Sequence, residues 1–114
     1  MSQTFGQKLR ELRKAKNLSQ RELADKVGVD FSYISKVEND RLPPPSADTI
    51  VKICDILEVE ADSLLALTGK MPTDAKQMLG SSVGAQKFIK QAQGMSLTDD
   101  EWHKLTKGLK RLRS

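Results

Sequence analysis

The stretch SQRELADKVGVDFSYISKVEND, residues 19–40, limits the possible folds of this chain more than any other part. Ser19 and Glu22 have the spacing of a capping box, which predicts a short helix over residues 19–27. Gly28 ends that helix, and Asp30 is placed to cap a second one over residues 31–39. Two short helices joined by a tight glycine turn predict a helix-turn-helix.

The rest of residues 1–69 also has helical periodicity, with no strand pattern. Further helices are expected over residues 5–16, 47–59 and 60–69, after a proline-rich loop at 40–46. The sequence therefore predicts an all-α domain of five helices. Its expected core is Phe5, Leu9, Leu12, Ala15, Leu23, Ala24, Val27, Ile34, Val37, Ile50, Ile53, Cys54, Leu57, Leu64, Leu65 and Leu67.

Outward-facing positions are predicted by the same pattern. Every position of the 31–39 helix other than Ile34 and Val37 is expected to face solvent. The same holds for the basic side chains of the first helix, which are Lys8, Arg10, Arg13, Lys14 and Lys16.

After residue 69 the composition changes, and residues 70–84 read as a linker with a short helix from Thr73 to Leu79. Residues 85–114 form a helical extension, with a helix over 85–93, a break at Gly-Met-Ser and a capping box from Thr98 to Glu101. Four large apolar residues then step by three, four and three positions, as in the seam of a packed helix pair. This predicted dimerisation surface consists of Trp102, Leu105, Leu109 and Leu112, together with Phe88, Ile89 and Met95.

The alternatives for residues 70–114 are binding of a different protein and packing on the chain's own core. Dimerisation is preferred because one helical hairpin buries too little surface to be stable alone.

Composition favours a polyanionic partner and gives no sign of catalysis. The net charge is +4, and two basic blocks, residues 1–41 and 72–114, flank an acidic one. A single cysteine excludes an internal disulfide, and a lone His103 does not suggest a metal site. No catalytic motif or cofactor signature is present, so neither an enzyme nor a bound cofactor is expected. Without an apolar span or signal core, a cytoplasmic protein is expected, nucleoid-associated when bound to DNA.

Residues 5–69 resemble the lambda-repressor and Cro class, the Xre-type family. The motifs that carry the resemblance are LRELRKAKNLSQRELADKVGV, SYISKVEND, PPSADTIVKICDILEV and DSLL. The resemblance implies a five-helix DNA-binding domain in which the 31–39 helix enters the major groove of double-stranded DNA.

The resemblance also implies roles for individual residues. Phe31, Ser32 and Lys36 match positions that meet base edges, and Ser35 borders them. Gln20 would bond a phosphate and brace the start of the 31–39 helix. The other positions near the phosphate backbone are Tyr33, Asn39, Arg41 and Arg10.

The chemistry of these residues indicates which bases they could contact. Lys36 suits the O6 and N7 of a guanine, and Phe31 suits a thymine methyl, unlike the glutamines that some family members carry. For Phe31 and Tyr33 the alternative is packing against the core.

The function expected from the sequence is a DNA-binding transcriptional regulator, written as a repressor although the sequence does not distinguish a repressor from an activator, that acts as a homodimer on a near-palindromic operator. The alternative is an antitoxin that binds its toxin through the C-terminal region and regulates its own operon.

Overall fold

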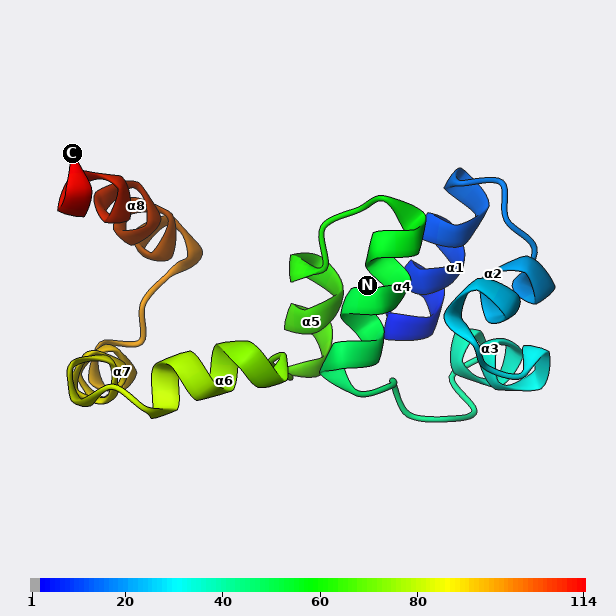
Figure 1. Cartoon of the computed structure of the whole chain (residues 1–114), viewed down its shortest axis with the longest axis horizontal. Helices are drawn as coiled ribbons and strands as arrows, with labels where there is room; N and C mark the ends of the chain where they lie inside the picture. Colours follow the sequence, from blue (N-terminus) through cyan, green and yellow to red (C-terminus); the bar gives the residue numbers. More distant parts are fainter. Residues whose placement is uncertain (1–2) are drawn as a thin grey trace. The chain divides into compact units, whose positions relative to one another are not determined.

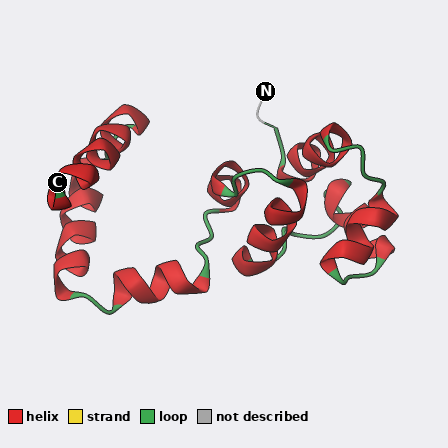
Figure 2. Cartoon of the chain, turned by 45° about the horizontal axis from the view of Figure 1, so that its top comes forward, coloured by secondary structure: helices red, strands yellow, loops and turns green. Residues whose placement is uncertain are grey.

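The structure is a computed structural model that describes residues 3–114. Throughout that range the chain forms helices and loops without a strand (Figure 2), which confirms the predicted all-α class. The chain divides into two compact units, Met1–Ala75 and Lys76–Ser114. They are called the N-terminal unit and the C-terminal unit below, and each is described by itself.

The N-terminal unit contains the five predicted helices, labelled in Figure 1. Their starts follow the predicted caps. The Thr4 and Ser19 side chains accept hydrogen bonds from the backbone of Gln7 and Glu22, and each pair closes a capping box. The helices are α1 (Phe5–Ala15), α2 (Gln20–Val27), α3 (Phe31–Glu38), α4 (Ala47–Leu57) and α5 (Asp62–Thr68).

The turn between α2 and α3 forms as predicted. Gly28 adopts a left-handed conformation at φ 88°, which a side chain would strain, and its N–H bonds to the carbonyl of Ala24. Asp30 occupies the first position before α3, but its side chain makes no capping bond to the helix backbone. It accepts a hydrogen bond of 3.1 Å from the hydroxyl of Ser32 instead, so the predicted cap at Asp30 is only positional.

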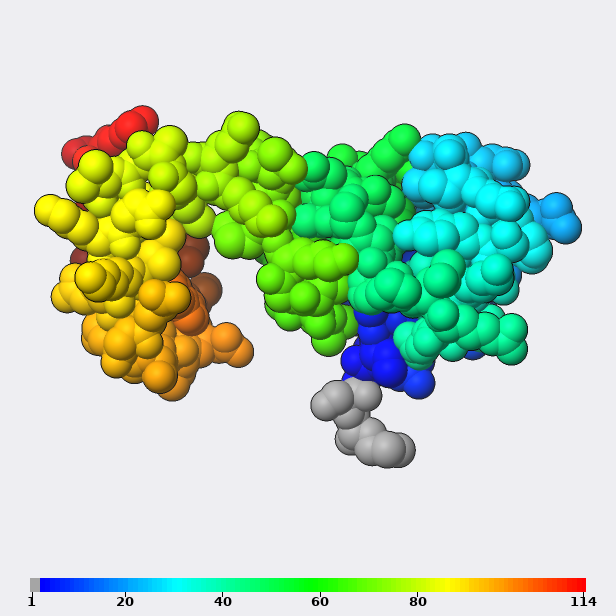
Figure 3. Space-filling model, turned by 90° about the horizontal axis from the view of Figure 1, so that it is seen from below, coloured from blue at the N-terminus to red at the C-terminus, as the bar shows by residue number. Residues whose placement is uncertain are grey.

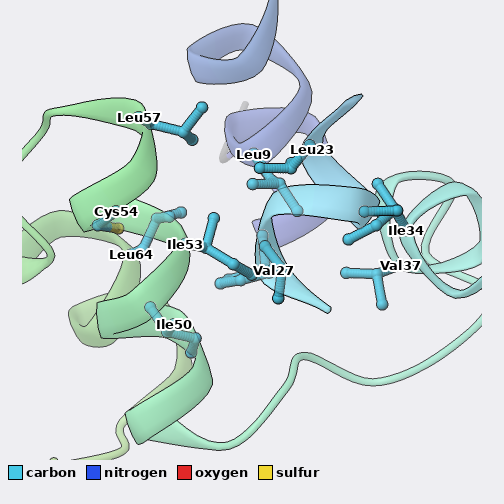
Figure 4. Packing of buried hydrophobic residues seen from close by; sticks show 12 residues of the cluster. Leu9, Leu23, Val27, Ile34, Val37, Ile50, Ile53, Cys54, Leu57 and Leu64 are labelled. Atoms are coloured by element: carbon cyan, nitrogen blue, oxygen red, sulfur yellow. The ribbon is translucent and has the colours of Figure 1, made fainter. Parts of the chain in front are cut away.

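One apolar cluster holds the N-terminal unit together. In it, α3 packs on α1 and α2, while α4 packs on α2 and α5. Side chains from all five helices meet in this cluster, and most of them are seen in Figure 4. Cys54 is buried there as predicted, and burial raises the pKa of its thiol.

Four predicted core positions lie differently. Leu67 is 48% exposed and Ala15 is exposed, while Leu12 and Leu65 are only partly buried against the cluster. Ala15 is the last residue of α1 and Leu67 the second to last of α5, so each lies at a helix end. Periodicity predicts on which side of a helix a residue lies, but not whether a neighbouring helix extends far enough to cover it.

The C-terminal region holds α6 (Thr73–Gly80), α7 (Val83–Met95), α8 (Asp99–Leu109) and the 3-10 turn η1 (Lys110–Arg113). The capping box of Thr98 and Glu101 starts α8 as predicted. The expected break at Gly-Met-Ser is displaced, because α7 runs through Gly94 and Met95 and ends at Ser96, which has φ 49°. Among the described residues no helix is long and apolar enough to cross a bilayer.

Candidate DNA interface

Helix α3 is anchored by one face and exposes the other. Ile34 and Val37 are each 1% exposed and point into the core (Figure 4), as predicted. On the opposite side Phe31, Ser32 and Lys36 are exposed, and Ser35 is half-buried. In the space-filling view the residues of α2 and α3, in cyan, lie side by side on the surface of the N-terminal unit (Figure 3). The predicted base-reading residues therefore share one exposed surface.

A buried ion pair fixes the end of α3. The Arg13 guanidinium donates to both carboxylate oxygens of Glu38, at 2.6 and 3.0 Å, and to the carbonyl of Leu18 at 2.8 Å. Arg13 is 7% exposed and Glu38 is 2% exposed. The expectation that both face solvent is therefore wrong. Each charge is buried because the other neutralises it, which no local helical pattern could indicate.

The Glu38 carboxylate stays ionised in this setting. Burial by itself would raise its pKa, but the hydrogen bonds and charge of Arg13, with further bonds from Gln20 and Arg10, outweigh that effect. The net result is a pKa lowered from the ordinary value of 4.5. Glu38 is thus a fixed negative centre beneath three donor side chains.

Three predicted phosphate ligands gather around that centre. The Gln20 amide donates to Glu38 at 2.9 Å, and Arg10 lies 3.5 Å from the same oxygen. Arg10 also donates to the side-chain oxygen of Asn39 at 2.6 Å, and the Asn39 amide donates to the carbonyl of Ser35. Gln20 therefore contacts the end of α3, whereas the resemblance implied that it braces the start.

The start of α3 is covered by a residue that the sequence did not single out. The guanidinium carbon of Arg21 lies 4.5 Å from the centre of the Phe31 ring. Phe31 is 36% exposed and is not part of the core cluster, so the alternative of core packing does not hold for it. Tyr33 does pack partly against the core.

The remaining predicted phosphate ligand, Arg41, is exposed just beyond α3. The neighbouring Asp40 bonds this loop to the start of α1. The Asp40 carboxylate accepts from the Thr4 hydroxyl at 2.8 Å and from the Gly6 N–H at 3.3 Å. Within residues 3–114 no cluster of side chains suits a metal ion.

The C-terminal unit presents a groove between α7 and α8 with a volume of about 650 Å³. Phe88 lines it, and the Phe88 and Trp102 rings lie 6.4 Å apart at an angle of 56°. Ile89 lies on another face of α7, in a separate hollow, so it does not share the groove. The groove's apolar lining includes Phe88, Ala92, Met95, Leu97, Leu105, Leu109 and Leu112.

In this five-helix domain one face of α3 is buried in the core and the other is exposed. This arrangement defines a helix-turn-helix domain. A family model described as helix-turn-helix matches residues 9–64. The chain belongs to this family, of the Xre or lambda-repressor type.

Curated relatives are transcriptional regulators by name. The chain is 37% identical over 82 residues to the uncharacterized HTH-type transcriptional regulator RghRB of Bacillus subtilis, covering 72% of this chain and 59% of the relative. It is 38% identical over 61 residues to the HTH-type transcriptional regulator SinR of the same organism, covering 54% of this chain and 55% of SinR. The chain thus spans less than two thirds of the length of these relatives.

Solved structures agree with the fold. A crystal structure of SinR, described as the master regulator for biofilm formation, in complex with DNA matches with a TM-score of 0.51 and 37% identity. It covers 54% of this chain and 98% of that one. A SinR protein/SinI protein complex matches over 96% of this chain with a TM-score of 0.52. At 24% identity it shows the fold alone.

Proposed function

We propose that the chain is a sequence-specific DNA-binding transcriptional regulator, acting as a repressor, that places α3 in a major groove. The observation that carries this is the α3 surface itself, where Phe31, Ser32 and Lys36 are exposed together on a helix whose other face is fixed in the core. The major groove of B-DNA is about 12 Å wide and admits an α-helix such as α3. The similarity of this domain to the DNA-bound SinR structure supports the same function.

Base reading is assigned to the exposed side chains of α3. Lys36 donates to the O6 and N7 of a guanine, and Ser32 bonds a base or a phosphate. Ser35 lies at the border of the contact, with less surface free. These residues lie in the first two turns of α3, and the N-terminal residues of recognition helices make such contacts.

Phosphate binding is assigned to the polar residues around α3. Gln20, Arg10 and Asn39 are already positioned by hydrogen bonds to one another or to Glu38, so less side-chain freedom is lost on binding. Tyr33 and Arg41 complete the set. Counterions released from neutralised phosphates make the affinity fall steeply with salt.

The C-terminal unit is proposed to hold two copies together. Its apolar groove and its large exposed side chains would be covered by the same unit of a second copy. Two domains joined in this way bind half-sites about 34–36 Å apart, or a multiple of that spacing, on a near-palindromic operator. The antitoxin alternative has no support among the relatives above, which carry regulator names.

Selection of bound DNA from a random pool tests this proposal. The expected result is a two-fold-symmetric consensus. Lys36→Ala should then cost about 1–3 kcal/mol at one base pair of each half-site. Lys52→Ala, an exposed lysine on α4, is the matched control and should leave the consensus unchanged. A pool without enrichment contradicts DNA reading, and an asymmetric single half-site contradicts the homodimer.

A further inference from the structure

Arg21 and Phe31 form a pair on the surface assigned to DNA. Arg21 is the second residue of α2, and Phe31 is the first residue of α3. The guanidinium carbon of Arg21 lies 4.5 Å from the centre of the Phe31 ring, and both side chains are exposed. The pair therefore joins the two helices at their DNA-facing starts.

The guanidinium has unused donors. Within the described part of the chain Arg21 makes no hydrogen bond or ion pair, and the ring is its one specific contact. A cation over an aromatic face is held by the ring's quadrupole, while its N–H groups stay free to donate at the edge. This differs from Arg10 and Arg13, whose guanidinium groups are bonded to Glu38.

The spacing of the pair suits stacked base pairs. The guanidinium carbon lies no more than 4.5 Å above the plane of the ring, because the distance to the ring centre is an upper limit. Successive base pairs are about 3.4 Å apart along B-DNA. The Phe31 ring can therefore contact one base pair while the Arg21 guanidinium contacts the adjacent base pair.

We propose that Arg21 and Phe31 read one base-pair step together, resting on the proposed DNA-binding function. Phe31 contacts the methyl group of a thymine, and Arg21 donates two hydrogen bonds to the O6 and N7 of a guanine in the adjacent base pair. Helix α2 crosses the phosphate backbone, and contact with the Phe31 ring directs the Arg21 side chain from α2 toward the groove. Arg21 is thus a specificity-determining residue of the site, and Phe31 both reads its own base and positions Arg21.

The experiment compares variants on the consensus from DNA selection and on its single base-pair changes. Arg21→Ala should weaken binding to the consensus by roughly tenfold to a hundredfold and abolish the preference for the guanine, as for a lost bidentate contact. Arg21→Lys should keep the charge yet lose most of that preference, because it lacks the planar fork. Lys52→Ala again serves as the control.

A double-mutant cycle tests the coupling. Phe31→Leu keeps an apolar side chain for the thymine methyl but removes the aromatic face, so the guanine preference should fall while the thymine preference remains. The double variant Arg21→Ala/Phe31→Leu should then bind the consensus little worse than Arg21→Ala alone. Thermal unfolding of each variant should match the original chain, since neither residue belongs to the core.

Three results overturn the proposal. A consensus without adjacent thymine and guanine in each half-site excludes it directly. An equal loss for Arg21→Ala on all sequences would assign Arg21 to a phosphate instead. Additive losses in the cycle would show that the two residues act separately. An original chain that enriches no DNA rejects the proposed function as well, whereas these three results leave that function standing.

Discussion

The two units are both helical, but only one of them buries its apolar side chains. In the N-terminal unit Leu9, Leu23 and Ile50 are fully buried, whereas no residue of Lys76–Ser114 is buried. The large exposed apolar residues there are Met78, Val83, Phe88, Met95, Trp102, Leu105, Leu109 and Leu112. Amphipathic periodicity thus predicts which side of a helix is apolar, but it does not say what covers that side. In the N-terminal unit the apolar side chains are buried by other helices of the same chain. In the C-terminal unit we expect a second copy to bury them.

The largest effect is expected from the buried ion pair that only the N-terminal unit has. Glu38→Ala leaves the Arg13 guanidinium buried without its counter-charge and should cost about 3–5 kcal/mol of unfolding free energy. This is a large share of the about 5–15 kcal/mol typical of a domain. Urea unfolding followed by circular dichroism measures it.

Glu58→Ala is the matched control for the ion pair. Glu58 pairs with Lys16 at 2.9 Å, but its side chain is 74% exposed. An exposed pair is screened by water and salt and contributes little to stability, so this variant should unfold nearly as the original chain does. Equal losses in the two variants would show that burial of the Glu38 pair is unimportant.

The second prediction compares a leucine buried within one chain with a leucine expected to be buried between two copies. Leu9→Ala, in the N-terminal core, should cost about 2–5 kcal/mol at any protein concentration. Leu105→Ala, in the α7–α8 groove, should instead raise the dimer dissociation constant about tenfold, for a contact worth more than about 1 kcal/mol.

The chain's own chromophores can follow the two units separately. It has a single tryptophan, Trp102 in α8, and a single tyrosine, Tyr33 in α3. The unfolding midpoint by Trp102 fluorescence should rise with protein concentration, while the transition of the N-terminal unit should not. A Trp102 midpoint independent of concentration would contradict dimerisation through the C-terminal unit.

Acid should weaken the N-terminal unit through Glu38. The pKa of Glu38 is lowered in the folded chain, so its contribution is fully present above the unfolded value of 4.5 and is lost as pH falls through the folded value. Urea midpoints measured from neutral pH down to about 3 should therefore fall below about pH 4.5.

Glu38→Gln isolates this effect, because the amide cannot titrate. The variant should be less stable at neutral pH and should lose less stability on acidification than the original chain. The exposed carboxylates with lowered pKa values, such as Glu22 and Glu58, remain in both proteins. Identical pH profiles for the two proteins would mean that Glu38 does not cause the acid sensitivity.

Most of the fold could be predicted because its signals are local. The capping boxes at Ser19 and Thr98 and the left-handed turn at Gly28 lie within a few residues of the features they define. The periodicity of apolar residues supplied most of the core. Where a helix end or a neighbour decides burial, as for Leu67, the same pattern fails.

The site could be predicted only as a surface. The exposed positions of α3 follow from its periodicity and from the family resemblance. The contacts that organise them join residues far apart in sequence: Arg13 with Glu38, Gln20 with Glu38, and Arg21 with Phe31. No spacing rule relates such residues, because their proximity depends on how α1 and α2 pack on α3.

The smallest effect concerns two capping boxes of the same type, one in each unit. Ser19→Ala and Thr98→Ala each remove a side-chain acceptor at a helix start, at a cost of about 1 kcal/mol. In the N-terminal unit this cost should lower the stability of the whole core, because α2 unfolds with it. In α8, an 11-residue helix too short to be stable alone, the cost should appear as local fraying.

Amide hydrogen exchange distinguishes these two responses. Thr98→Ala should speed exchange in α8 at low protein concentration and less so at high concentration, where association stabilises the helix. Ser19→Ala should speed exchange throughout the N-terminal core by one common factor at both concentrations. If Thr98→Ala also behaves independently of concentration, the apolar face of the C-terminal unit is not covered by a second copy, and the contrast between the units needs another explanation.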